Sequence, residues 1–106
     1  MSDIEVEINN LDVKDVIKQV VDLKMNEQQR VLLLKSLIDI QYDMDVYTKM
    51  YTFVIEESMF YECQDYAKKE LECTILDLKY KVLSMLESAC LKLVNNKIEE
   101  IDIFKD

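Results

Sequence analysis

The apolar positions of this chain recur at intervals of three and four over most of its length, which is the spacing of one face of an α-helix. The clearest seam lies between residues 27 and 56, where the intervals of four and three alternate as in a heptad repeat. Its members are Leu33, Leu37, Ile40, Met44, Tyr47, Tyr51 and Val54. The spacing predicts a long helix from Glu27 to Glu56, roughly 45 Å if unbroken. A break at Asp43 or Asp45 is the alternative, because Asp can cap a new helix.

A shorter helix is predicted before the long one, from about Leu11 to Lys24. Its apolar stripe consists of Val13, Val16, Ile17, Val20 and Val21. Asn10 is the expected N-cap of this helix, and Asn26 the expected N-cap of the long helix. Gln29, three residues after Asn26, is expected to complete a capping box with its side chain.

The heptad fails after Val54, so we predict a turn within residues 57–65 and a last long helix beyond it. The seam of that helix comprises Leu71, Ile75, Leu78, Val82, Met85 and Ala89. Asn95-Asn96 is the expected stop. Residues 1–9 alternate acidic and apolar positions and are expected to form a loose acidic arm. For residues 97–106 we expect either a short docking helix or a frayed tail.

Glycine and proline are both absent, whereas an average chain of 106 residues carries roughly seven Gly and five Pro. Sheets and hairpins use Gly where their turns need positive φ. We therefore predict an all-α fold over one domain, residues 1–106, as an antiparallel bundle of three to four helices with a long central helix and coiled-coil-like packing. Two helices are too apolar for a three-helix monomer to cover, which predicts a homodimer or a covering protein partner.

The net charge of −9 disfavours nucleic acids and acidic membranes as partners, because both are bound chiefly through Lys and Arg. No run reaches the ~18 apolar residues of a membrane span, and the acidic N-terminus lacks the apolar region of a signal peptide. These features predict a cytoplasmic protein, in a cell or in an infected host. The abundance of Lys, Ile and Asn is typical of AT-rich genomes, including those of viruses and phages.

The residues most used in catalysis and metal binding are missing. Without His, the Ser-His-Asp, Cys-His and HExxH sites are excluded, and without Gly, so are the phosphate-binding loops. Cys63, Cys73 and Cys90 match neither a zinc pattern nor a CxxC motif, and their apolar neighbours predict reduced thiols in the core. We therefore predict that the chain is not an enzyme and has no catalytic residue, cofactor or metal.

Residues 39–65 combine seven acidic residues and one Lys with six of the nine aromatic residues. Aromatic residues are enriched in protein interfaces, and surrounding acids select basic partners. The predicted partner-binding residues are Asp43, Asp45, Glu56, Glu57, Phe60, Tyr61, Glu62 and Asp65. The alternative is that Tyr47, Tyr51 and Phe53 belong to the core and the acids form its solvated side.

Three functions fit this pattern. The first is a protein-interaction or regulatory module, such as a viral or phage inhibitor of a host protein. The second is a nucleic-acid mimic whose carboxylates occupy the groove of a DNA-binding protein, although interspersed Lys residues dilute the acidic array. The third is a dimeric helical subunit of a larger assembly, which the heptad seams favour.

Overall fold

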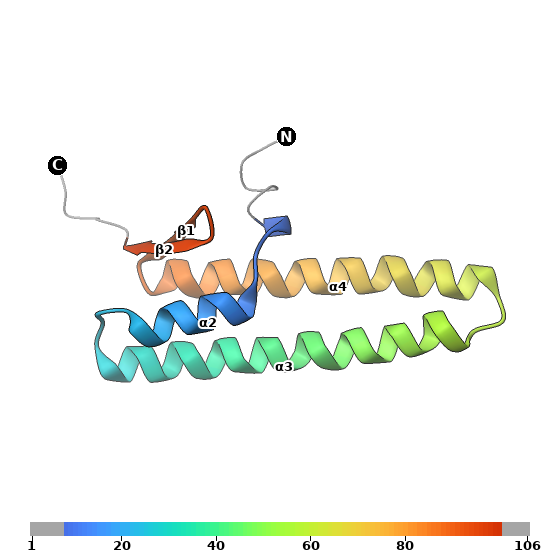
Figure 1. Ribbon diagram of the computed structural model, residues 1–106, viewed down its shortest axis with the longest axis horizontal. Helices are drawn as coiled ribbons and strands as arrows, with labels where there is room; N and C mark the ends of the chain where they lie inside the picture. Colours follow the sequence, from blue (N-terminus) through green and yellow to red (C-terminus); the bar gives the residue numbers. More distant parts are fainter. Residues whose placement is uncertain (1–7, 101–106) are drawn as a thin grey trace.

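The computed structural model describes residues 8–100, which form three helices and one two-stranded sheet. Helices α3 and α4 run antiparallel side by side, and the shorter α2 packs against α3 at the end of the pair far from the α3–α4 turn (Figure 1). The chain is mostly helical, so the predicted all-α class holds with the addition of a small sheet. The elements are α2 (Val13–Asp22), α3 (Glu27–Glu57), α4 (Tyr61–Ser88), β1 (Leu91–Val94) and β2 (Lys97–Glu100).

Helix α2 begins two residues later than predicted, and its N-cap is Asp12 rather than Asn10. The Asp12 carboxylate accepts hydrogen bonds from the backbone N–H groups of Lys14 and Asp15, at 3.0 and 3.4 Å. Leu11 lies outside the helix because its own N–H donates to the carbonyl of Ile8 and its side chain is buried in the core. Because Leu11 is held in the core outside the helix, the next residue, Asp12, takes the N-cap position.

The predicted N-cap of α3 is confirmed. The Asn26 side chain accepts hydrogen bonds from the backbone N–H groups of Gln28 and Gln29, at 2.9 and 3.3 Å. Gln29 contributes only its backbone donor to this cap, and its side chain does not make the expected return bond of a capping box. Arg30, the single arginine, joins the end of α2 to the start of α3. Its guanidinium donates to the carbonyls of Val21 in the last turn of α2 and of Leu23 and Met25 just after that helix. One cation thereby satisfies acceptors that the end of a helix leaves free.

The predicted long helix is confirmed, because α3 is continuous from Glu27 to Glu57 and the alternative of a break at Asp43 or Asp45 does not occur. Asp43 and Asp45 are exposed on its surface, and Asp45 accepts a hydrogen bond from the side chain of Gln41 one turn earlier, at 3.1 Å. That side-chain partner belongs to the helix itself, so nothing diverts the backbone there. The turn predicted within residues 57–65 is confirmed at residues 58–60.

The last helix ends at Ser88, well before the predicted stop at Asn95-Asn96. Cys90 follows with φ of 60°, a left-handed conformation that ends the helix. Asn95 and Asn96 then adopt φ of 52° and 64° and form the two-residue turn between β1 and β2. Positive φ at both positions is the geometry of a type I′ hairpin turn, which Asn tolerates better than other residues that carry a side chain.

Two terminal predictions are also corrected. Lys97–Glu100 form strand β2, so this part of the expected tail is neither a helix nor frayed. Gln19 of α2 holds the hairpin in place: its amide nitrogen donates to the carbonyl of Asn96 at 2.6 Å, and its amide oxygen accepts from the N–H of Ile98 at 2.8 Å. Ile8, the last apolar position of the expected loose arm, is buried. Residues 1–7 and 101–106 lie outside the described residues.

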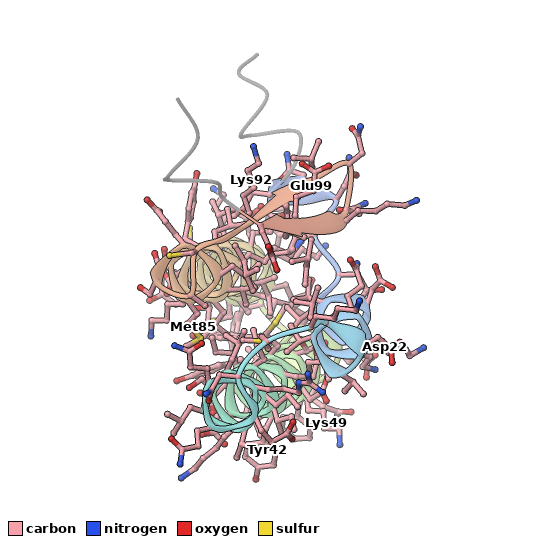
Figure 2. All side chains as sticks on the ribbon, turned by 90° about the vertical axis from the view of Figure 1, so that its left-hand side faces the viewer. Asp22, Tyr42, Lys49, Met85, Lys92 and Glu99 are labelled. Atoms are coloured by element: carbon pink, nitrogen blue, oxygen red, sulfur yellow. The ribbon has the colours of Figure 1, made fainter. Side chains whose placement is uncertain are left out.

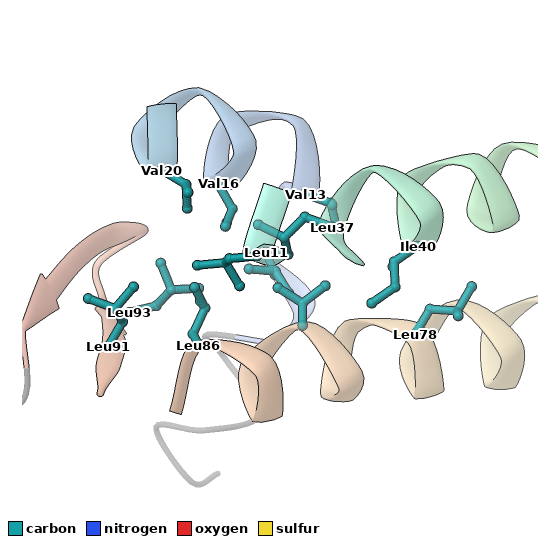
Figure 3. Close-up of a cluster of buried hydrophobic side chains, with 12 residues drawn as sticks. Leu11, Val13, Val16, Val20, Leu37, Ile40, Leu78, Leu86, Leu91 and Leu93 are labelled. Atoms are coloured by element: carbon teal, nitrogen blue, oxygen red, sulfur yellow. The ribbon is translucent and has the colours of Figure 1, made fainter. Parts of the chain in front are cut away.

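The hydrophobic core occupies the end of the helical pair at which α2 and the β-hairpin pack (Figure 3). Leu37, Val82 and Leu86 are fully buried where the helices meet, and Leu91 and Leu93 close the core from the hairpin. The cluster comprises Leu11, Val13, Val16, Val20, Leu33, Leu37, Ile40, Leu78, Val82, Leu86, Leu91 and Leu93. The outer face of the hairpin pairs Lys92 with Glu99 across the strands, an arrangement that suits a solvated sheet face (Figure 2).

Candidate protein-binding site

The turn between α3 and α4 is held by its own hydrogen bonds. The Ser58 N–H donates to the carbonyl of Val54 at 3.0 Å, and the Ser58 hydroxyl oxygen accepts from the N–H of Phe60 at 3.2 Å. Gln64, on the first turn of α4, donates from its side-chain amide to the carbonyl of Ser58 at 2.8 Å. These bonds fix a three-residue connection without Gly or Pro. We call residues 56–65, which comprise this turn and the adjoining helix ends, the helical tip.

Three consecutive large apolar side chains point into solvent at the helical tip. Met59 is 93% exposed, Phe60 68% and Tyr61 74%. Phe60 occupies the N-cap of α4 and makes no capping hydrogen bond with its side chain. Ser, Thr, Asp or Asn at that position would stabilise the helix by about 1 kcal/mol. The residue found there instead presents an aromatic ring to solvent.

The structure gathers six of the eight predicted partner-binding residues at the helical tip. Glu56, Glu57 and Glu62 are exposed around the apolar side chains. Asp65 is partly exposed, and its carboxylate lies 3.0 Å from the Nζ of Lys69, so part of its charge is balanced. Met59, the most exposed of these apolar residues, was not among the predicted residues, although its place inside the predicted turn could have indicated it.

Asp43 and Asp45 lie apart from the other six. They precede Glu57 by 14 and 12 residues on the same continuous helix, a separation of roughly 18–21 Å at 1.5 Å per residue. A single small interface centred on the turn would not reach them. Their distance makes them suitable controls for any test of the carboxylates at the helical tip.

The helical tip stands well beyond the hydrophobic core. Ile40 is the last residue of α3 in the core, and the 17 residues from there to Glu57 span roughly 25 Å. We call residues 44–55 of α3 and 66–77 of α4 the helical stem. Within it, Ala67 alone is fully buried. The stem therefore projects the tip outward while contributing little to the core.

The sequence left open whether the aromatic residues of the stem belong to the core or to a partner-binding surface, and the structure shows some of each kind of environment. Tyr47 and Tyr51, one turn apart, stack with ring centroids 6.5 Å apart and interplanar angle 26°. Tyr51 is partly buried, as the core interpretation expects. Phe53, in contrast, is 66% exposed, so that interpretation is wrong for this residue. Helix α3 carries apolar side chains on an outward face as well as on the face toward α4.

The prediction of buried thiols is wrong, because Cys63, Cys73 and Cys90 are all free and exposed. The buried positions of α4 are Ala67, Leu78, Val82 and Leu86, and Cys73 falls off that stripe. Cys63 stands four residues before Ala67 but in the exposed first turn of α4, at the helical tip. Cys90 follows the helix in the exposed left-handed position. Apolar neighbours in the sequence therefore did not indicate which side of α4 is buried and which is exposed to solvent.

A groove of about 450 Å³ lies between α3 and α4, near the core end of the pair. Figure 2 shows Met85, one of its lining residues, between the two helices on the side away from α2. Its walls combine apolar side chains with amide and hydroxyl groups and include no charged residue. The groove therefore offers apolar contact and hydrogen bonds, and its walls hold no acid–base pair. The lining residues are Gln29, Leu32, Leu33, Ser36, Ser84, Met85, Ser88 and Ala89.

Other kinds of site find little support in residues 8–100. No group of three His, Cys, Asp or Glu side chains in this part of the chain is arranged to hold a metal ion. None of the described helices has the length and apolar character needed to cross a membrane. Comparison of the chain with protein-family models, curated proteins and solved structures gives no match.

Proposed function

We propose that this chain is a protein-interaction module that regulates another protein by binding it through the helical tip. The observation that carries the proposal is the run Met59, Phe60 and Tyr61, three adjacent large side chains that are each at least two thirds exposed. Single exposed apolar residues are ordinary on protein surfaces, whereas a contiguous group is typical of an interaction site. Aromatic residues and Met are also the types that interfaces favour.

The energetics of the tip suit a compact contact. Burying one such side chain contributes about 1.5–3 kcal/mol. Binding also loses less conformational entropy when the contact surface is already ordered, and the Ser58 and Gln64 hydrogen bonds provide that order. The helical stem, which we infer to be a coiled-coil-like spacer, holds the tip clear of the core so that a partner can surround it.

The charges around the tip indicate the chemistry of the partner. Glu56, Glu57 and Glu62 are exposed beside the apolar run, and the whole chain carries a net charge of −9. The complementary surface is an apolar pocket bordered by Lys or Arg. Charges at the border of an interface act mainly on the association rate and on selectivity, so binding through this site weakens as salt concentration rises.

The first experiment replaces Met59 with a photo-cross-linking amino acid in the full chain and captures partners from a lysate of the source cell. The same substitution at Tyr80, which is exposed on α4 away from the tip, is the control. A partner must be captured from position 59 and not from position 80. Serine at residues 59–61 must abolish that capture, while serine at Leu76 and Tyr80 must preserve it. Equal capture by both serine variants would contradict the proposal.

A second experiment tests the carboxylates against a matched control. Glu57→Lys combined with Glu62→Lys changes the net charge as much as Asp43→Lys combined with Asp45→Lys, and all four side chains are exposed. We expect the first pair to reduce affinity for the captured partner at least tenfold and the second pair to change it less than threefold. Equal losses would mean that net charge, rather than this site, attracts the partner.

A further inference from the structure

The outward face of α3 carries a second, separate apolar surface. Six of its side chains are each more than half exposed: Val31, Leu32, Ile38, Tyr42, Met50 and Phe53. Figure 2 shows Tyr42 on the side of α3 that points away from α4. The face runs along the helix from the core end to the stem, and none of the described elements covers it.

The size of this face reaches the upper end of what a monomer usually exposes. A large apolar side chain presents roughly 150–200 Å² when fully exposed, so six that are more than half exposed present on the order of 600 Å². The largest apolar patch on a typical monomer is about 300–600 Å². A stable two-protein interface buries about 800 Å² from each partner, of which a little over half is apolar. The face therefore has the area that one copy contributes to a dimer.

The order of residues along the centre of this face is symmetric about Tyr42, the middle residue of α3. Aliphatic residues stand four positions to either side (Ile38 and Val46), lysines seven positions to either side (Lys35 and Lys49), and Val31 and Phe53 eleven positions to either side. We call these seven residues the outer stripe, and the exposed Leu32 and Met50 border it along one side. The intervals of three and four within the stripe keep its residues on one face of the helix.

This symmetry favours a second copy of the chain as the occupant. When two identical helices pair antiparallel about a two-fold axis at Tyr42, apolar residues oppose apolar residues: Ile38 faces Val46 of the other copy, and Val31 faces Phe53. No acidic residue belongs to the outer stripe. Asp39 and Asp45 are exposed at the edges of the stripe, three residues to either side of Tyr42, so the carboxylates lie at the border of the contact rather than along its centre. The lysine stems lie along the apolar surface and extend their ammonium groups into solvent.

We propose that the chain forms an antiparallel homodimer through the outer stripe, with Tyr42 on the two-fold axis. The dimer does not require the proposed function, because the outer stripe and the helical tip share no residue. It does place two helical tips at opposite ends of one particle. Such a particle could engage two partner molecules, or two sites on one partner, with increased avidity.

Disulfide cross-linking tests this geometry directly. The three native cysteines are exposed and are first replaced by serine, with helicity checked by circular dichroism. A disulfide forms only when the two Cα atoms are within about 7 Å. Tyr42→Cys must therefore cross-link to itself, whereas Val31→Cys alone must not, because its counterpart in an antiparallel dimer lies roughly 33 Å away. The double variant Val31→Cys with Phe53→Cys must cross-link.

Light scattering gives the second measurement, with the native full chain at micromolar concentration. We expect twice the chain mass of 12.6 kDa, and 12.6 kDa for Tyr42→Asp with helicity unchanged. Tyr80→Asp, which adds the same charge to an exposed tyrosine of α4, must leave the dimer intact. A native mass of 12.6 kDa, or self-cross-linking of Val31→Cys alone as in a parallel pair, would overturn the proposal. Loss of partner capture by the helical tip leaves these readouts unchanged.

Discussion

The stability of the fold should be concentrated at one end of the molecule, and two substitutions in one heptad seam test this. Leu37 and Val54 both belong to the heptad seam of α3, but Leu37 is 0% exposed where three helices meet and Val54 is 41% exposed in the stem. We expect Leu37→Ala to lower the free energy of unfolding several times more than Val54→Ala. The sequence repeat by itself would assign the two positions similar roles.

The magnitudes follow from burial. Truncating a fully buried Leu to Ala removes its transfer free energy and leaves a cavity, for a total of about 3–4 kcal/mol. Truncating Val54 removes two methyl groups that water already reaches in part, so no closed cavity remains and the loss is about 1 kcal/mol or less. Since small domains are stable by about 5–15 kcal/mol, Leu37→Ala removes a large part of the total. The corresponding fall in Tm is about 15–25 °C.

The assay is urea unfolding followed by far-UV circular dichroism, at one fixed chain concentration so that any self-association acts equally on all variants. We expect the midpoint to fall sharply for Leu37→Ala and slightly for Val54→Ala, with similar slopes. Equal midpoints for the two variants would refute the reasoning. That result would mean that the stem has a closed core of its own and that Val54 is covered in solution.

Three further predictions concern the connections between elements. Cys90→Gly should stabilise the fold by about 0.5–1 kcal/mol, because Cys90 has φ of 60° and an exposed side chain. Cys73→Gly, within α4, should destabilise it. Urea midpoints of the two variants that shift in the same direction would contradict this prediction. Arg30→Met should lower the free energy of unfolding by about 2–3 kcal/mol, because the carbonyls of Val21, Leu23 and Met25 lose their donor. Arg30→Lys should be more stable than Arg30→Met but less stable than the native chain, since Lys lacks the several donors of the guanidinium group. A native urea midpoint for Arg30→Lys would contradict the role of the guanidinium group. Gln19→Met removes the two hydrogen bonds from α2 to the hairpin, so it should raise the hydrogen-exchange rates of the amides of β1 and β2 and leave those of α3 unchanged. Unchanged exchange rates in β1 and β2 would show that Gln19 does not hold the hairpin in place.

The candidate site was predictable from the sequence where it depends on local chemistry. Acidic and aromatic residues collect within residues 39–65, and the failure of the heptad after Val54 located the turn, so six of the eight predicted residues lie together at the tip. Asp43 and Asp45 were placed with them by proximity in the sequence alone. An unbroken helix converts 12 residues of separation into roughly 18 Å, and the sequence left open whether α3 was broken there.

The sequence by itself determined the helices and their main boundary signals. The spacings of three and four, the absence of Gly and Pro, and the capping residue Asn26 are all local properties of the sequence. The helices and the N-cap that they predict are found in the structure. The β-hairpin was missed for a local reason as well. Asn95-Asn96 adopts the positive φ angles that such turns usually obtain from Gly, and a chain without Gly gave no sign of it.

Only the tertiary structure decided which apolar face is covered. Periodicity shows that a helix has an apolar face, but it does not give the length of the neighbours that pack on it. Helix α2 has 10 residues and α3 has 31, so α2 and the hairpin enclose a core at one end only and leave the seam of the stem partly open. The exposed tip and the partly open seam of the stem follow from that difference in length, whereas the outer stripe is open because it lies on the side of α3 away from α4.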